Sequence, residues 1–212
     1  MKVELKQNMR IVFQGDSITD CGRREPAHAP YGRGFVSIIA SWLLARFPEM
    51  NLNILNRGVS ADRTKNLISR WSNDCVGLKP DLVSILIGIN NVAFRYNGND
   101  PTPVDDFDKQ YETILKRTRD ETDAVLVICE PFLLACPEGI EVWREDLDPK
   151  IQVIRELARR FSALYVPLDG IFSAASTRVY PSFWAEDGVH PTPQGHGLIA
   201  QAWMETVLGV VP

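Results

Sequence analysis

Short apolar runs alternate along the chain with longer segments in which apolar residues recur every three or four positions. The short runs predict strands over residues 9–14, 52–55, 82–87, 124–129 and 164–168. The longer segments predict helices over residues 34–47, 62–76, 104–119, 143–161 and 193–208. Thr192 and Pro193 are suited to the first positions of the last helix, and Gly209 to its end.

This alternation of strands and helices is typical of a parallel sheet with helices on both faces. In such sheets, ligands bind beyond the carboxyl ends of the strands. We therefore expect Ser17, Gly58 and Asn90, which follow the first three strands, to lie along one edge of the sheet. The connections over residues 20–33, 96–103 and 131–142 are long enough to wall a pocket there.

The predicted helix over residues 34–47 is apolar on nearly every side. Its apolar residues are Phe35, Val36, Ile38, Ile39, Trp42, Leu43, Leu44 and Phe47. A helix of this kind is buried by more than one neighbour. Two arrangements account for it: cover by the chain's own last helix, or contact with a second subunit.

Composition and charge exclude several classes of protein. The 212 residues fit one domain, and a net charge of −4 without a basic block argues against a nucleic-acid partner. No segment approaches the roughly 20 apolar residues of a membrane span. The polar residues 1–10 lack the apolar core of a signal peptide. The four cysteines match neither a disulfide framework nor a zinc motif, so we expect free thiols and a cytoplasmic location.

Three residues carry the candidate chemistry. Ser17 follows the first strand directly, and Asp187 and His190 stand three positions apart near the other end of the chain. A serine hydroxyl needs an adjacent base to become a nucleophile, and imidazole is suited to that role at neutral pH. A carboxylate then holds the imidazole in the productive tautomer. We expect Ser17 to be the nucleophile, His190 the base and Asp187 its partner.

A metal site is the alternative for Asp187 and His190. Such a site needs a third and a fourth ligand, and the only other histidines are His28 and His196. The sequence therefore favours the serine esterase over the metal pair, with no metal and no organic cofactor.

Four short blocks stand in order at the predicted strand ends. They are Gly15-Asp16-Ser17, Asn56-Arg57-Gly58, Gly88-Ile89-Asn90 and Asp187-Gly188-Val189-His190. From residue 12 to residue 191, the chain thereby resembles the SGNH subgroup of the GDSL esterases and lipases. The resemblance implies one SGNH hydrolase domain over residues 1–212, folded as a three-layer α/β/α, flavodoxin-like sandwich of about five parallel strands.

The resemblance also implies an oxyanion hole. The backbone N–H groups of Ser17 and Gly58 and the side-chain amide of Asn90 are its expected donors, since such donors stabilise the charge of the tetrahedral intermediate. Gly58 and Asn90 are also ordinary turn residues. One departure from the family pattern is Asn91, which stands where an Asp is usual. It leaves the hydrogen bonding around the oxyanion hole open.

Residues 15–23, 84–90 and 189–191 look like the bacterial intracellular acetylxylan esterases of this family. That resemblance implies removal of acetyl groups from xylo-oligosaccharides through an acetyl-enzyme, and assembly into a homo-oligomer. Trp184 is a candidate platform for a sugar face or, alternatively, a core residue. Two other functions stay open. One is a carboxylesterase, thioesterase or lysophospholipase acting on longer acyl chains, and the other is a binding module that kept the fold.

Overall fold

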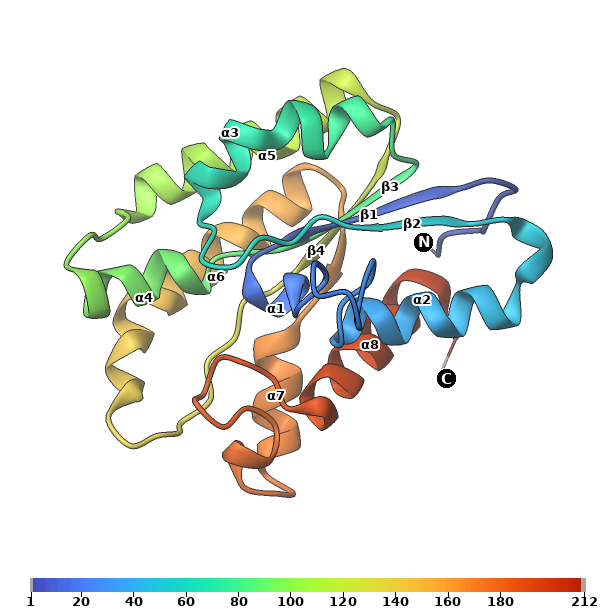
Figure 1. The fold of residues 1–212 in the computed structure, drawn as a ribbon. Helices are drawn as coiled ribbons and strands as arrows, with labels where there is room; N and C mark the ends of the chain where they lie inside the picture. The colour runs from blue at the N-terminus through green and yellow to red at the C-terminus, as the bar shows by residue number, and fades with distance from the viewer. Residues whose placement is uncertain (1, 211–212) are drawn as a thin grey trace.

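The computed structural model describes residues 2–210 and contains one five-stranded sheet (Figure 1). All strand pairs are parallel, in the order β2-β1-β3-β4-β5. The strands are β1 (Arg10–Gly15), β2 (Asn53–Asn56), β3 (Leu82–Leu86), β4 (Val125–Cys129) and β5 (Leu164–Val166). This arrangement confirms the predicted parallel α/β fold.

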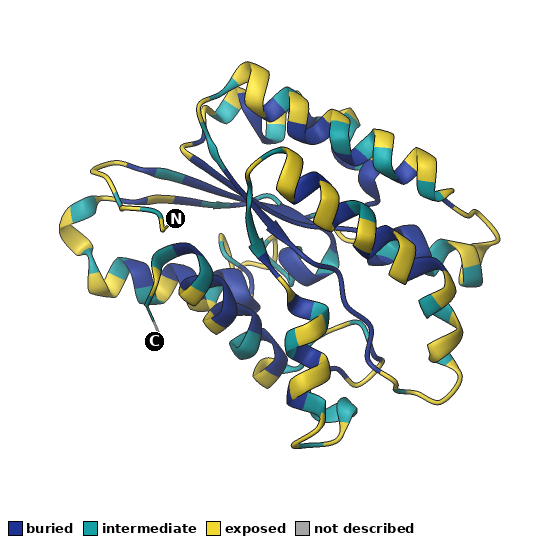
Figure 2. Cartoon of the chain, turned by 180° about the vertical axis from the view of Figure 1, so that it is seen from behind, coloured by how far each residue is buried: buried dark blue, intermediate teal, exposed yellow. Residues whose placement is uncertain are grey.

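Helices cover both faces of the sheet. One layer consists of α3 (Thr64–Asp74), α5 (Val104–Glu121) and α6 (Arg144–Arg160), packed around the buried Trp71. The other consists of α2 (Phe35–Arg46), α7 (Leu168–Ser176) and α8 (Pro193–Leu208), packed around the buried Trp203. Figure 2 shows the strands buried between these two layers and the exposed residues on the outer sides of the helices.

Two further helices lie at the carboxyl ends of the strands. They are α1 (Ser17–Asp20), which follows β1, and α4 (Ile89–Gly98), which follows β3. Short 3-10 helices occur at residues 48–50, 76–78, 140–143 and 181–183. Within residues 2–210, no helix has the length and apolar character needed to cross a membrane. All four cysteines are free, and Cys75 and Cys129 are buried.

The predicted last helix has the expected boundaries. Thr192 Oγ1 accepts a hydrogen bond from the Gly195 N–H at 3.2 Å, and Gly209 ends α8 with φ at +74°. The fifth strand is shorter than predicted, because Pro167 ends it and Leu168 already begins α7. Helices α1, α4 and α7 were not predicted from the sequence pattern.

Helix α2 packs against α8, which is the first of the two arrangements considered for its apolar surface. Its residues Phe35, Ile39 and Leu43 are fully buried in the core that contains Trp203. On its outer side, Ile38 is 38% exposed. Contact of this side with a second subunit stays a prediction.

Candidate active site

The turn between β1 and α1 presents Ser17. A side chain at Gly15 would collide with the Leu86 carbonyl, so the strand must end with a residue that has no Cβ. Asp16 then caps α1, since its Oδ1 accepts a hydrogen bond from the Ile18 N–H at 3.0 Å. Asp16 is buried, and this burial raises the pKa of its carboxyl to about 7. Ser17 is therefore held at the first position of α1, at the carboxyl edge of the sheet.

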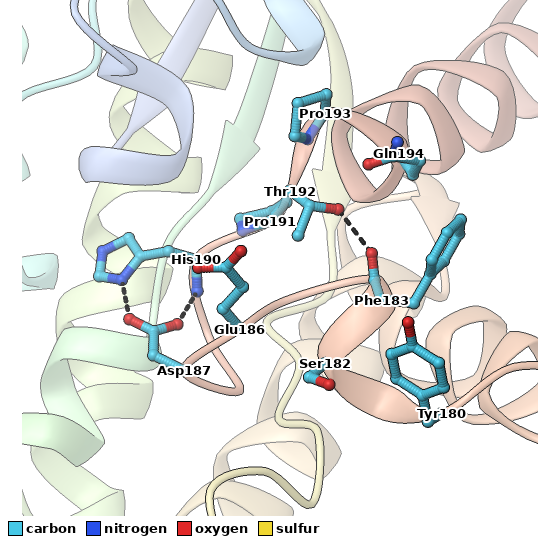
Figure 3. A pocket seen from close by; sticks show the side chains of 10 residues that line it. All are labelled: Tyr180, Ser182, Phe183, Glu186, Asp187, His190, Pro191, Thr192, Pro193 and Gln194. Atoms are coloured by element: carbon cyan, nitrogen blue, oxygen red, sulfur yellow. Dashed lines mark hydrogen bonds and ion pairs between the residues drawn. The ribbon is translucent and has the colours of Figure 1, made fainter.

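Asp187 and His190 lie on the loop before α8 and reach Ser17 from the opposite end of the chain. The Ser17 Oγ is 2.9 Å from Nε2 of His190, and Nδ1 of His190 is 2.7 Å from Oδ2 of Asp187 (Figure 3 shows the Asp187–His190 contact). The other Asp187 oxygen accepts the backbone N–H groups of Val189, at 3.1 Å, and of His190, at 2.7 Å. The structure thus brings the three expected residues into one hydrogen-bonded chain.

The electrostatics of the pair fix its protonation. Burial disfavours the charged form of Asp187, but the hydrogen bonds from the ring and backbone of His190 and from Val189 outweigh it and lower the Asp187 pKa to about 2. The hydrogen bond to Asp187 in turn raises the pKa of His190. A charged Asp187 holds a proton on Nδ1, which leaves Nε2 of the neutral ring to accept the proton of Ser17.

The other histidines do not join this pair as ligands. His196 Nδ1 accepts a hydrogen bond from the Phe35 N–H at 3.2 Å, and burial lowers the pKa of His196 to about 4. His28 lies beside Glu25. Within residues 2–210, no group of three or more His, Cys, Asp and Glu side chains is arranged to hold a metal ion.

The connection over residues 131–142 packs against the loop that carries Asp187 and His190. Gly188 has φ at +81°, and a Cβ there would collide with the Cys136 carbonyl. The Leu134 N–H donates to the Gly188 carbonyl at 2.9 Å. Cys136 Sγ lies 3.0 Å from the Ala185 carbonyl. These contacts fix the position of the loop and, with it, of His190.

Two cavities meet at His190 and Pro191. One, of about 690 Å³, is lined by Tyr180, Ser182, Phe183, Glu186, Asp187, His190, Pro191, Thr192, Pro193 and Gln194 (Figure 3). The other, of about 530 Å³, is lined by Ser17, Ile18, Asp20, Cys21, Gly22, Arg24, Glu25, Arg33, Ser60, His190, Pro191 and His196. The connection over residues 20–33 therefore walls the serine side of the site, as expected.

Trp184 is not among the residues that line these two cavities, so its expected role as a platform stays a prediction. Its ring packs against Phe183 at 4.9 Å between centroids, and its carbonyl accepts the Thr192 N–H at 2.8 Å, so it supports the start of α8. The aromatic residues on the cavity wall are Tyr180, which is 67% exposed, and Phe183. No sequence signal separates these isolated aromatics from core residues.

Two of the three expected oxyanion-hole donors are available. The Ser17 N–H opens α1, where helix N–H groups have no intrahelical partner. The Asn90 side-chain amide donates to the Asp62 carbonyl at 3.2 Å, and its second N–H has no acceptor among residues 2–210. The expectation for Gly58 is wrong, because its N–H donates to Asn56 Oδ1 at 3.0 Å. Gly58 is instead a packing glycine, since a Cβ there would collide with the backbone of Asp20.

The sequence reasoning missed Ala61, which follows in the same connection. The Asp62 N–H bonds to the Val59 carbonyl at 3.2 Å and closes a turn, with Ala61 in the left-handed region at φ +67°. Within residues 2–210, the Ala61 N–H has no acceptor. Its neighbour Ser60 lines the Ser17 cavity, and its neighbour Asp62 binds the Asn90 amide.

Asn91 is fully buried and well paired. Its Oδ1 accepts the Thr64 N–H at 3.3 Å, and its Nδ2 donates to the hydroxyls of Thr64 and Thr102 at 3.0 and 3.2 Å. The unusual asparagine therefore ties α4 to the start of α3.

Comparison with known proteins places this geometry in a family. Residues 13–198 match the model of the GDSL-like lipase/acylhydrolase family. The chain belongs to this family. An acetylxylan esterase from Geobacillus stearothermophilus is 31% identical to it over 205 residues, which is 93% of each chain. The protein is therefore a GDSL hydrolase that acts on carboxylic esters.

Solved structures agree with this assignment. A protein of Parabacteroides merdae described as a GDSL-like lipase superposes on this GDSL hydrolase with a TM-score of 0.91 and 33% identity, covering 97% of this chain and 98% of its own. The crystal structure of an acetylxylan esterase from Geobacillus stearothermophilus superposes with a TM-score of 0.87 and 28% identity, covering 96% of both chains.

Proposed function

We propose that this GDSL hydrolase is a serine esterase that removes acetyl groups from acetylated carbohydrates, with Ser17 as nucleophile, His190 as general base and Asp187 as its partner. The observation that carries the proposal is the continuous hydrogen-bonded chain from Ser17 Oγ through both ring nitrogens of His190 to Asp187, with distances of 2.9 and 2.7 Å. This is the arrangement that activates a serine hydroxyl.

In the first half of the reaction, Ser17 Oγ attacks the acetyl carbonyl while His190 Nε2 takes its proton. Negative charge then develops on the former carbonyl oxygen, and the proposed donors to it are the N–H groups of Ser17 and Ala61 and the amide of Asn90. The intermediate then collapses as the bond from the acetyl carbon to the sugar oxygen breaks, and His190 donates its proton to that leaving oxygen. In the second half, a water molecule activated by the same ring hydrolyses the acetyl-enzyme.

Three observations favour a carbohydrate alcohol. A relative that shares 31% of its residues with this chain is an acetylxylan esterase. In addition, the Ser17 cavity carries polar and charged side chains, Asp20, Arg24, Glu25 and Ser60 among them, that suit a ligand rich in hydroxyl groups. The exposed ring of Tyr180 is available on the other side of His190 to stack on a sugar face.

Acetate release from acetylated xylo-oligosaccharides tests the proposal, with the wild type and Ser17→Ala measured side by side. We expect release by the wild type alone. Equal release by Ser17→Ala would overturn the role of Ser17. No release by a wild type that reacts with a fluorophosphonate probe at Ser17 would keep the serine hydrolase but reject this substrate, and p-nitrophenyl esters from acetate to octanoate would then locate its acyl length.

A further inference from the structure

One guanidinium group joins the strand before Ser17 to the turn that carries Ala61. Arg70 lies on α3 with its side chain 16% exposed. Its Nε donates to Oδ2 of Asp62 at 2.7 Å, and its two Nη atoms reach Gln14 Oε1 at 2.9 Å and the Gly15 carbonyl at 3.3 Å. A fourth contact, at 3.2 Å, is made with Asp74 on the same helix.

Asp62 connects this guanidinium to the proposed oxyanion hole. Its carboxylate binds Arg70, while its backbone carbonyl accepts the Asn90 amide at 3.2 Å. The same residue closes the turn that places Ala61 at positive φ. Two of the three proposed oxyanion donors are therefore held by one residue, whose side chain Arg70 fixes.

Arg70 also contacts Gly15, which lies two residues before the nucleophile. The Gly15 carbonyl accepts both the Arg70 guanidinium, at 3.3 Å, and the Val59 N–H at the start of the turn, at 3.0 Å. Arg70 thus touches both segments whose separation sets the distance from Ser17 to the oxyanion donors. A planar guanidinium can donate hydrogen bonds in two fixed directions at once, whereas a lysine ammonium is a single point of charge.

From these contacts we propose that Arg70 is a positioning residue of the oxyanion hole. The proposal rests on the function proposed above, because it needs the charge of the reaction to develop beside Ser17. Arg70 does not touch the substrate, and it acts through Asp62, which holds both the Asn90 amide and the turn of Ala61. Its loss should lower kcat and leave KM nearly unchanged, because the oxyanion donors act in the transition state and not on the bound ester.

The test is a double-mutant cycle on p-nitrophenyl acetate hydrolysis with Arg70→Lys, Asn90→Ala and the combined variant. A displacement of about 1 Å costs up to about a hundredfold, so we expect Arg70→Lys to lower kcat by about ten- to a hundredfold. Asn90→Ala removes a donor and should cost about a hundredfold or more. The combined variant should lose less activity than the product of the two single losses, because part of the effect of Arg70 acts through the Asn90 amide, which is already gone.

Arg117→Lys is the matched control. Arg117 lies on α5 and makes comparable contacts, to Glu121 at 2.8 Å and Ser72 at 2.9 Å, away from Ser17. It should keep wild-type kcat. Circular dichroism and thermal unfolding confirm that each variant is folded. If Arg70→Lys does not fold, Asp62→Asn takes its place, because it keeps the backbone carbonyl that binds Asn90 but removes the charge that binds Arg70.

Two results would overturn the proposal. One is a folded Arg70→Lys with wild-type kcat, and the other is a combined variant whose loss equals the product of the single losses. Ser17→Ala separates this proposal from the function on which it rests. An active Ser17→Ala would reject the proposed function, whereas an inactive Ser17→Ala beside a fully active Arg70→Lys would reject the role of Arg70 alone.

Discussion

At the residue scale, the protonation of His190 governs the proposed reaction. The ring must be neutral to accept the Ser17 proton, and the hydrogen bond that it donates to Asp187 raises its pKa above the ordinary 6.5. Activity should therefore fall on the acid side of a midpoint that lies above pH 6.5. His196, with a pKa of about 4, stays neutral in this range and cannot cause that loss. The measurement is a profile of kcat/KM against pH.

Two substitutions identify the group behind this midpoint. Asp187→Asn removes the charge that raises the His190 pKa, so the midpoint should move down and the rate should fall by about four orders of magnitude. Asp16→Asn keeps an oxygen that accepts the Ile18 N–H. In this variant the midpoint should stay near its wild-type pH, and most of the rate should be retained. Because burial raises the Asp16 pKa to about 7, loss of the midpoint in Asp16→Asn would assign it to that carboxyl.

The sequence predicted Ser17, Asp187 and His190 because the chemistry demands those side chains. It did not predict Ala61, because every residue except proline carries a backbone N–H and only the fold decides which one is left free. Gly58 was chosen for its residue type, yet its N–H is bound to Asn56. The half-buried position of Trp184 against the core likewise follows from packing that a single sequence does not reveal.

At the element scale, two glycines of α8 give opposite expectations. A Cβ at Gly197 would meet no atom within 4 Å. Because alanine loses less backbone entropy than glycine in a helix, Gly197→Ala should raise the free energy of unfolding by about 0.5–1 kcal/mol. A Cβ at Gly195 would collide with the Trp184 carbonyl, so Gly195→Ala should lower it by about 1–3 kcal/mol. Urea unfolding measures both, and equal effects of the same sign would contradict this packing.

The strands and the five longer helices could be predicted because their apolar positions repeat regularly. Helix α4 was missed because Asn90, Asn91 and Gly98 are residues typical of turns. Helix α7 was missed because its first residue, Leu168, continues the apolar run of β5. In both cases the tertiary surroundings outweigh local preference.

At the scale of the whole molecule, both cores share one sheet. Trp71 and Trp203 are fully buried on its opposite faces. We propose that the chain is one folding unit. Both helical layers bury their apolar residues against the same sheet, so unfolding of the sheet would expose the apolar residues of both layers. Calorimetry should show a single unfolding transition. Variants that keep only Trp71 or only Trp203 should give coincident unfolding curves when tryptophan fluorescence is measured. Two separated transitions would contradict this.

The nucleophile precedes β3 in the chain, whereas its base follows β4. A break in the exposed segment at residues 99–101, between α4 and α5, would therefore give one fragment with Ser17 and another with His190. We expect neither fragment to cleave esters on its own, and the two should rejoin only if β3 pairs with β4 along the register from Leu82–Val125 to Leu86–Cys129. Colour released from a chromogenic acetate by the mixed fragments would then report their association, which makes this fold a candidate split reporter.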